Sequence, residues 1–382
     1  MSAKEGVKKI IEKVIQEAYH LSGGRQKGGT LVVVEVPKEK VHGDYSTSIA
    51  LSLAKKLNKS PIEVAKEIVS KIGTNKLFER IEVASPGFIN FYLSKDFFID
   101  RLKKVDKNFG RNDNLEGKKI IIEYTDPNIL KEFHIGHLMS NAIGESVSRI
   151  IEFHGAKIKR VCYQSDVGIG IAKAVYGKMK NPQLSWNEAY VFGNKDYKEN
   201  ESAKKEIVEL NKKIFSKSDK EVNKIYESGK KWSIDYFGEV YKKLGTKFDE
   251  IVFESQVADF GNKLVENNIG KVFEKGEQGA VIFKGEKNGL HTRVFINSEG
   301  LPTYEAKELG LAEYKYKKYK YDKSIVVTGN EVNEYFKVVM AAMKEILPGL
   351  EEKTHHIGHG MMRLPEGKMS SREGNIILYD DL

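Results

Sequence analysis

Residues 118–164 have the sequence KKIIIEYTDPNILKEFHIGHLMSNAIGESVSRIIEFHGAKIKRVCYQ. The apolar run at 118–124 is typical of a strand buried in a parallel sheet. A turn follows, then helical periodicity at 137–155 and a second predicted strand at 156–164. A strand, a helix and a strand in this order form a βαβ unit, which predicts an α/β domain with a doubly wound parallel sheet. Ligands of such sheets bind at the carboxyl ends of the strands.

The predicted α/β domain covers residues 113–382. Its sheet is expected to resume with strands at 248–256 and 323–329, and residues 279–306 have a hairpin-like pattern. Residues 172–247 are polar, lysine-rich and helical in periodicity. We interpret them as a helical insertion into the α/β domain.

The sequence of residues 1–112 predicts a separate α+β domain. Its apolar spacing at the N-terminus indicates an amphipathic helix. The other predicted elements are a strand at 30–36, helices at 45–57 and 61–72, and two strands within 80–94. The polar stretch KNFGRNDNLEG at 107–117 is the expected linker to the α/β domain.

The composition limits the classes of protein to which the chain can belong. Of its 382 residues, 40% are hydrophobic, which is typical of a folded globular protein. A single cysteine, Cys162, excludes an internal disulfide and a cysteine-based zinc site. No apolar run reaches the roughly 18 residues of a membrane span, and the charged N-terminus lacks a signal-peptide core. We therefore expect a cytoplasmic protein without a membrane partner.

The net charge of +9 favours a polyanionic partner such as nucleic acid. The densest basic stretch is YKYKKYKYDK at 314–323. Two interpretations of this stretch are open. Either it is the solvated end of a helix, or its tyrosines and lysines stack on and neutralise nucleic acid.

The tetrapeptide HIGH occurs twice, at 134–137 and at 356–359. The first copy lies between a buried strand and the start of a helix, where free backbone N–H groups and the helix dipole form an anion site. Its glycine lets a nucleotide approach the backbone, and its two histidines can hydrogen-bond phosphates. The expected phosphate contacts are Lys131, His134, Gly136 and His137.

The second copy of HIGH predicts a strand, because no helix start follows its last histidine. It leads towards the glycine-flanked, polar, basic loop GKMSSREGN at 367–375. A mobile loop with a lysine, here Lys368, can close over a triphosphate and stabilise its charge during transfer. Alone the loop is a weak signal. It becomes specific because it follows a strand–HIGH–helix unit in this order.

In these two motifs the chain resembles a class I aminoacyl-tRNA synthetase, whose Rossmann-type domain carries HIGH first and KMSKS later. The finer resemblance is to the arginyl-tRNA synthetases, and it covers nearly the whole chain. Residues 123–155 resemble the segment around HIGH in that family, and GKMSSREGN resembles its form of KMSKS. Residues 43–57 (GDYSTSIALSLAKKL) and 83–94 (VASPGFINFYLS) resemble the family's N-terminal domain, which touches the outer corner of the tRNA.

The resemblance implies an arginine–tRNA ligase. L-Arginine would attack the α-phosphorus of ATP to give arginyl-adenylate and pyrophosphate, and the arginyl group would then pass to tRNA(Arg). Mg²⁺ would travel with ATP, with no metal site in the protein itself. A monomer is expected, and the family generally needs tRNA for activation. The resemblance assigns ATP to His134, Gly136, His137, Lys368, Met369 and Ser370, with Lys131 sharing the role of the second KMSKS lysine, which is Ser371 here.

The resemblance also assigns an arginine pocket. A buried guanidinium needs carboxylates in fork geometry, and the acids that match are Glu254 and Glu308. Tyr304 lies one helical turn before Glu308, so the two share a helix face. Many relatives have aspartate where this chain has Glu308, whose side chain is one methylene longer. Asn128 and Glu123 match the positions that hold the backbone end of arginine.

The chain departs from the family pattern at several places. The sequence SDVG at 165–168 keeps Asp166 but lacks the family's tryptophan, and Val332 replaces a common glutamine or histidine. The helical anticodon-binding domain is missing after the KMSKS-like loop, so we expect a fragment whose activity alone is open. Two other hypotheses are another nucleotidyl transferase with an HxGH motif and a non-catalytic RNA-binding relative.

Overall fold

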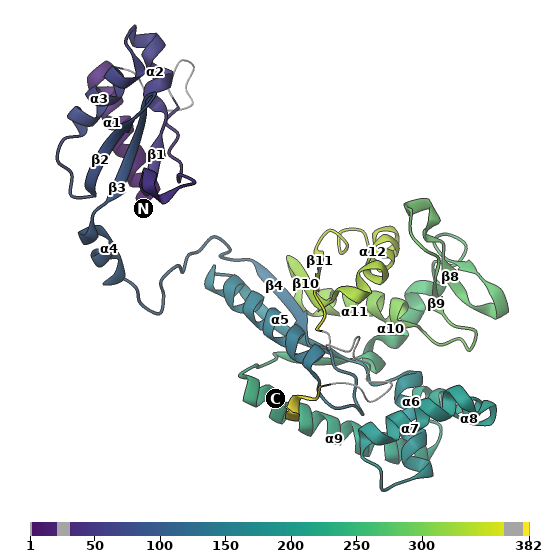
Figure 1. The fold of residues 1–382 in the computed structure, drawn as a ribbon. Coiled ribbons are helices and arrows are strands. Elements are labelled where there is room, and N and C mark those ends of the chain that lie inside the picture. The colour runs from purple at the N-terminus through teal and green to yellow at the C-terminus, as the bar shows by residue number, and fades with distance from the viewer. Residues whose placement is uncertain (1, 21–30, 363–376, 382) are drawn as a thin grey trace. The chain divides into compact units, whose positions relative to one another are not determined.

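The computed structural model describes residues 2–20, 31–362 and 377–381. The chain divides into two compact units, Met1–Gly110 and Arg111–Leu382, which are drawn in Figure 1. Each unit has hydrophobic clusters of its own. The KMSKS-like loop at 367–375 lies outside the described residues.

The first unit packs three helices against a small antiparallel sheet. The helices are α1 (Ala3–Tyr19), α2 (Ile49–Leu57) and α3 (Pro61–Ile72), and a short α4 (Lys95–Leu102) follows the sheet. The strands β1 (Tyr45–Thr47), β2 (Phe78–Ala84) and β3 (Phe88–Leu93) lie in the order β1-β3-β2. The apolar stripe that the sequence predicted on α1 is buried in this core at Val7, Ile11, Val14 and Ile15.

The strand predicted at 30–36 is wrong for the part of it that the structure describes. Within 31–36 the backbone forms only one bridge, in which Glu35 and Ser46 exchange hydrogen bonds of 2.9 and 2.8 Å. Val32 and Val34 are nevertheless buried. The alternating pattern therefore indicates that one face of this segment is buried, and it does not indicate a continuous series of strand hydrogen bonds.

The helix predicted at 45–57 begins only at Ile49. Residues 45–47 instead pair with β3, where Tyr45 lies opposite Phe91. Ser46 Oγ also donates a 2.7 Å hydrogen bond to Asn90. Strand pairing therefore outweighs helix propensity at the start of this segment.

The second unit contains a five-stranded parallel sheet, which confirms the predicted fold class. Its strands are β4 (Lys119–Tyr124), β5 (Lys157–Gln164), β6 (Glu250–Phe253), β10 (Lys323–Gly329) and β11 (Thr354–His359). They lie in the order β11-β10-β4-β5-β6, so the chain winds first to one side of β4 and then to the other. The direction reverses between β4 and β10, and ligands of doubly wound sheets bind at the carboxyl ends of the strands beside such a reversal.

The side chains of β4 alternate between the two faces of this sheet. Ile120, Ile122 and Tyr124 pack in one cluster with α5 (Ile135–Phe153). Ile121 packs in another cluster with α10 (Glu254–Glu266) and α11 (Tyr304–Tyr319). Figure 1 shows α5 and the α10–α11 pair on different sides of the sheet. Glu123 therefore projects from β4 towards α11.

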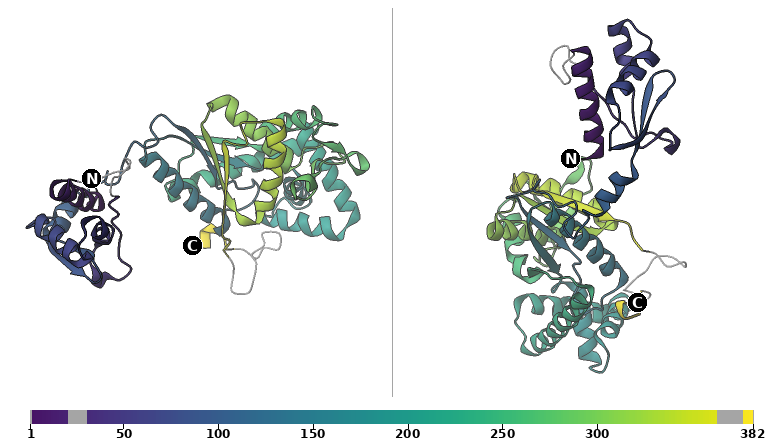
Figure 2. Two further views of the ribbon diagram at one scale, coloured as in Figure 1. Left: turned by 90° about the horizontal axis from the view of Figure 1, so that it is seen from above. Right: turned by 90° about the vertical axis from the view of Figure 1, so that its left-hand side faces the viewer.

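Helices fill the place of the insertion expected between β5 and β6. They are α6 (Ile169–Lys180), α7 (Trp186–Glu199), α8 (Glu201–Ser216) and α9 (Lys220–Leu244). They share a hydrophobic core that includes Ile207, Leu210, Tyr226 and Phe237. Figures 1 and 2 show them as one group beside the sheet.

The remaining elements lie between and after α10 and α11. A small antiparallel sheet is formed by β7 (Glu274–Lys275), β8 (Val281–Phe283) and β9 (Arg293–Ile296). The helix α12 (Asn333–Ile346) packs on β11 through Phe336, whose ring stacks on His356. Short 3-10 helices occur at Lys40–His42, Glu277–Gly279, Gly285–Asn288, Asn330–Val332 and Tyr379–Asp381.

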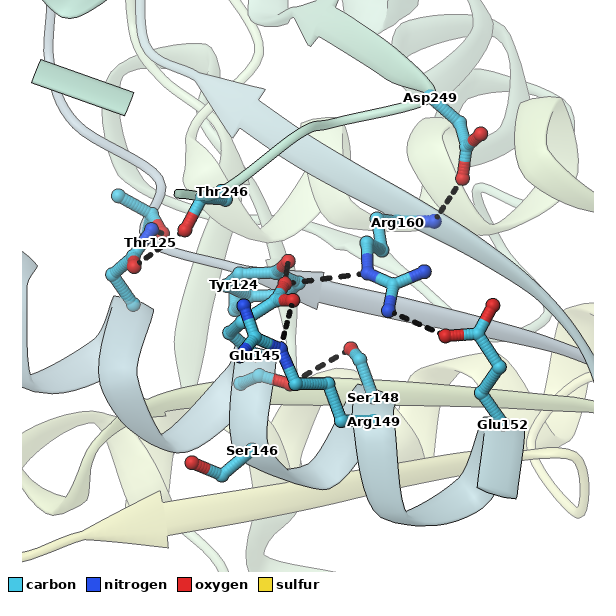
Figure 3. A network of polar contacts seen from close by, with 12 residues as sticks. Tyr124, Thr125, Glu145, Ser146, Ser148, Arg149, Glu152, Arg160, Thr246 and Asp249 are labelled. Atoms are coloured by element: carbon cyan, nitrogen blue, oxygen red, sulfur yellow. Dashed lines mark hydrogen bonds and ion pairs between the residues drawn. The ribbon is translucent and has the colours of Figure 1, made fainter. Parts of the chain in front are cut away.

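A network of polar contacts ties α5 to β4 and β5, as Figure 3 shows. The Tyr124 hydroxyl donates a 2.6 Å hydrogen bond to Glu145 on α5, and Arg160 on β5 donates to the same carboxylate at 3.2 Å. Arg160 also reaches Glu152 at 2.9 Å. A Cβ on Gly144 would lie 2.2 Å from the Tyr124 ring, so the glycine is what lets α5 approach β4. These contacts fix the helix whose N-terminus carries the first HIGH tetrapeptide.

The basic stretch at 314–323 lies at the end of α11, and part of it is buried. Lys315 and Tyr321 are each only 1% exposed. The Tyr314 hydroxyl donates to Glu250 of β6 at 2.8 Å, and the Lys318 ammonium donates to the same carboxylate. Much of this stretch therefore holds the end of α11 on the sheet.

Candidate active site

His134 and His137 form a reciprocal cap at the start of α5. The backbone N–H of Gly136 donates to His134 Nδ1 at 3.1 Å, and the backbone N–H of His134 donates to His137 Nδ1 at 3.3 Å. The two rings stack with their centroids 3.6 Å apart. The helix begins at Ile135, earlier than the sequence predicted, because His134 itself serves as the N-cap.

Both histidines are uncharged at neutral pH. Burial, helped by the charge of Lys131, lowers the pKa of His134 to about 4. Burial and the neighbouring His134 hold the pKa of His137 well below its usual value. Because each Nδ1 accepts a backbone N–H, each neutral ring carries its proton on Nε2. The pair therefore offers two N–H donors without a buried charge.

The turn between β4 and α5 is held in an uncommon conformation. Thr125, Asp126 and Leu130 all have positive φ, at 83°, 44° and 61°. The Asp126 carboxylate accepts the backbone N–H of Tyr163 at 2.7 Å, and Ser233 Oγ accepts the N–H of Leu130 at 2.8 Å. Non-glycine residues in this region are costly and cluster at functional sites. This turn carries Asn128 and Lys131.

The second HIGH tetrapeptide forms β11, as the sequence predicted. Its histidines are bonded within the fold: His356 Nε2 lies 2.7 Å from Thr328 Oγ1, and His359 Nε2 lies 2.7 Å from Ser140 Oγ on α5. Burial lowers the pKa of His356 to about 4. The second copy therefore connects β11 to β10 and α5.

The chain on both sides of residues 363–376 contacts the start of α5. Before this segment His359 reaches Ser140. After it, the Ile135 N–H donates to the Ile377 carbonyl at 3.1 Å, and the Tyr379 N–H donates to the Phe133 carbonyl at 2.8 Å. The predicted ATP ligands Lys368, Met369 and Ser370 belong to this segment and lie outside the described residues.

A cavity of about 510 Å³ opens beside the turn between β4 and α5, which carries Asn128 and Lys131. Of the predicted site residues it is lined by Asn128, Lys131 and Tyr304. The Lys131 ammonium lies 4.1 Å from the centre of the Tyr190 ring, which also lines the cavity. Lys307, which the sequence did not single out, lines it as well. The carboxylates of Glu123, Glu254 and Glu308 do not.

The three predicted acids instead form a buried cluster behind the cavity. Glu123 is 1% exposed, and its carboxylate accepts a 2.6 Å hydrogen bond from Lys315 of α11. Glu254 is 2% exposed and pairs with the Lys307 ammonium. The strand predicted at 248–256 ends at Phe253, so Glu254 is the first residue of α10.

Glu308 is the acid of this cluster without a partner. It is 8% exposed, and no hydrogen bond or ion pair to its carboxylate is found among the described residues. Burial, together with the charge of Glu123, raises its pKa to about 8. Burial also raises the pKa of the nearby Asp126 well above its usual value, again with Glu123 contributing.

The cluster is short of positive charge. The carboxyl groups of Glu123, Asp126, Glu254 and Glu308 face the two ammonium groups of Lys307 and Lys315. The buried hydroxyl of Tyr163 has no hydrogen-bond partner among the described residues, and the charges of Glu254 and Glu308 act on it. A buried cluster with surplus carboxylates and an unused hydroxyl suits a cationic ligand with several N–H donors.

Asp166 fixes the position of Glu254. It is fully buried and accepts hydrogen bonds from Lys230 (2.6 Å) and Tyr226 (3.0 Å) of α9. It also accepts the backbone N–H of Ser255 at 2.8 Å and its hydroxyl at 2.7 Å. The acid that the SDVG sequence retains therefore locks the N-terminus of α10 against the helical insertion.

Comparison with known proteins identifies the family of both units. Residues 101–382 match the family model of the class I tRNA synthetase (R) catalytic domain, and residues 5–93 match that of the arginyl-tRNA synthetase N-terminal domain. The chain is 30% identical to the arginine–tRNA ligase of Treponema denticola, over 91% of this chain and 62% of the relative. It is also 30% identical to that of Borrelia garinii, over 100% of this chain and 68% of the relative.

Two solved structures share the fold. The arginyl-tRNA synthetase of Thermus thermophilus superposes with a TM-score of 0.62 at 20% identity, covering 98% of this chain and 68% of that one. The Plasmodium falciparum enzyme gives a TM-score of 0.60 at 22% identity, covering 94% and 65%. The chain thus spans about two thirds of the length of its relatives, from 62% to 68% in the two ligases above.

Two further findings concern membranes and metals. None of the helices in the described part of the chain combines the length and the apolarity of a membrane span. Within residues 2–20, 31–362 and 377–381, no group of three or more His, Cys, Asp or Glu side chains is placed to hold a metal ion. With both of its units matched by family models, the chain belongs to the arginyl-tRNA synthetase family of class I aminoacyl-tRNA synthetases.

Proposed function

We propose that the chain activates L-arginine with ATP and transfers the arginyl group to tRNA(Arg) for translation. The observation that carries this proposal is the pairing of two unlike sites at the carboxyl edge of one sheet. A neutral histidine pair begins α5, and residues of β4, α10 and α11 form a buried cluster with surplus carboxylates. The first suits a polyphosphate, and the second suits a guanidinium.

ATP binding is assigned to the start of α5. The Nε2–H groups of His134 and His137 and the backbone N–H groups around Gly136 would donate to the phosphate oxygens. Lys131 would add a positive charge from the turn before the helix. We assign Lys368, Met369 and Ser370 to the same nucleotide, and the contacts of the flanking residues with α5 support this assignment. Mg²⁺ would arrive with the ATP phosphates.

Catalysis in this proposal rests on position and charge. An oxygen of the arginine carboxylate forms a bond to the α-phosphorus while the bond from that phosphorus to the pyrophosphate oxygen breaks. The negative charge that moves onto pyrophosphate is met by the histidine N–H donors, Lys131 and Lys368. The 2′-hydroxyl of the terminal adenosine then attacks the arginyl carbonyl, and AMP leaves.

Arginine binding is assigned to the cavity and the acids behind it. The guanidinium would lie between Glu254 and Glu308, which places two carboxylates around its five N–H groups. Asn128 and Tyr304, which line the cavity, would contact the rest of the substrate. Glu123 would act mainly through Lys315, because Lys315 already occupies its carboxylate.

The partners and location of the chain are part of the same proposal. We propose that Met1–Gly110 binds tRNA, since it matches the N-terminal domain of arginyl enzymes. We also propose that the protein is a cytoplasmic monomer.

The test is ATP–pyrophosphate exchange with each amino acid in turn, with and without tRNA(Arg). We expect exchange that depends on arginine and that tRNA stimulates strongly. Stimulation by another amino acid such as glutamate or cysteine, but not by arginine, would overturn the proposal. Tight tRNA binding without exchange would instead support a non-catalytic RNA-binding protein.

A further inference from the structure

Lys307 separates the cavity from the acidic cluster. It is 3% exposed, it lines the cavity, and its ammonium group pairs with the Glu254 carboxylate. Glu254 itself does not line the cavity. A ligand that enters the cavity can therefore reach this carboxylate only after the Lys307 ammonium has moved.

Lys307 is a partner of Glu254 within the same chain, so it does not diffuse away as a free ligand does. Its ammonium is tethered beside Glu254 from the adjacent helix α11, so it acts at a high effective concentration. An amino acid whose side chain ends in one ammonium group, such as lysine or ornithine, would replace it with an identical group. That exchange gains no new contact and costs the ligand its freedom of motion.

A guanidinium differs because it can use a second acid. Arginine presents N–H donors on two edges of a planar group, whereas an ammonium is a point charge. Glu308 lies one residue after Lys307 on α11 and has no partner among the described residues. A guanidinium can therefore replace Lys307 at Glu254 with one edge and also reach Glu308 with the other.

The Tyr304 ring is an alternative partner for the displaced Lys307 ammonium. The Lys307 Nζ already lies 4.4 Å from the centre of the Tyr304 ring, and this tyrosine is 57% exposed on the cavity side. An ammonium over a tyrosine face is attracted by the ring even at an exposed site. The ammonium can therefore keep this ring as a partner when it leaves Glu254.

We propose that Lys307 is a resident competitor of the arginine site: its ammonium occupies Glu254 in the free protein, and any cationic amino acid must displace it, a cost that arginine recovers through Glu308. This inference rests on the proposed arginine site. It assigns a role in setting affinity to a residue of the pocket that need not contact the bound substrate.

The test is calorimetric titration of the full 382-residue chain with arginine and with lysine. In Lys307→Met the resident ammonium is gone, so we expect the affinities for arginine and for lysine to rise together, each by about tenfold or more. Because both ligands displace the same ammonium from Glu254, the ratio of the two affinities should stay the same. In Lys307→Arg the resident guanidinium competes more strongly, so we expect arginine affinity to fall by about tenfold.

The matched control is Lys317→Met on the same helix, whose lysine side chain is 61% exposed and pairs with Glu313. It should leave both affinities unchanged. Unchanged arginine affinity in Lys307→Met, or wild-type arginine affinity in Lys307→Arg, would overturn the inference while leaving the arginine site intact. Failure of the wild-type chain to bind arginine would overturn the proposed site and this inference with it. If Lys307→Met does not fold, Lys307→Arg alone still decides between these outcomes.

Discussion

The histidine pair comes from four consecutive residues, whereas the acidic cluster brings together a strand, a helix start and a second helix. His134 and His137 are positioned by hydrogen bonds inside one helical turn. Glu123, Glu254 and Glu308 come from β4, α10 and α11. The histidines are partly buried and the three acids are buried, and both sites consist of groups that titrate.

The two sites deal with the cost of burial in opposite ways. The histidines lose their charge, so the anion site relies on N–H dipoles and the start of a helix. Among the acids, Glu254 and Glu123 face the ammonium groups of Lys307 and Lys315, whereas burial raises the pKa of Glu308 to about 8 and so holds a proton on it near neutral pH. A site for a guanidinium needs surplus carboxylate, and that surplus is destabilising until the ligand arrives. The stability and ligand affinity of the acidic cluster should therefore depend more on distant residues and on pH than those of the histidine pair.

The largest effect that we predict is a loss of stability on removing one half of a buried ion pair. Glu123→Gln leaves the fully buried Lys315 ammonium without its carboxylate. We expect the free energy of unfolding of this unit to fall by about 3–5 kcal/mol, measured by denaturant titration. The control is Glu334→Gln, because Glu334 pairs with Lys337 on the surface, and that pair should contribute nothing measurable. Equal small changes in both variants would show that the cluster is not a buried charged core.

A second effect separates the two copies of HIGH. His137→Asn removes an Nε2–H donor from the start of α5, and we expect ATP–pyrophosphate exchange to fall by about 10²–10³-fold. His356→Gln in the second copy keeps a group that can hydrogen-bond Thr328, so exchange should stay within about threefold of wild type. Comparable losses in the two variants would contradict the division of roles between a nucleotide site and a strand contact.

The same contrast explains what the sequence could predict. The βαβ pattern predicts the parallel sheet, and the first HIGH predicts a helix start after a buried strand, because both depend on residues close together in the chain. The pairing of Lys307 with Glu254 and of Lys315 with Glu123 could not be predicted from the sequence, because the partners lie 53 and 192 positions apart. The strand at 248–256 was predicted too long because Asp166 and Gln256 cap a helix at Phe253–Ser255, and those contacts exist only in the folded chain.

The smallest effect that we predict is a pH dependence of arginine affinity that arises from the acidic cluster. In the free protein Glu308 has a pKa of about 8, raised by burial and by Glu123. Between about pH 6 and pH 8 it is therefore mostly protonated, and a guanidinium must expel the proton to bind. Arginine affinity should then rise with pH by up to about tenfold per unit and level off above pH 8. His134, with a pKa of about 4, adds no slope in this range.

The effect of Glu308 on stability has the opposite sign. A carboxyl group whose pKa is raised on folding, here from 4.5 to about 8, favours the folded state while it is protonated. That stability is fully present below pH 4.5 and is lost as the pH rises through 8. Glu308→Gln should therefore bind arginine weakly with no slope between about pH 6 and pH 8, and should unfold at higher denaturant than wild type at pH 9 but not at pH 4. If the slope in arginine affinity persists in this variant, the titrating group is another acid of the cluster, with Asp126 the nearest alternative because its pKa is also raised.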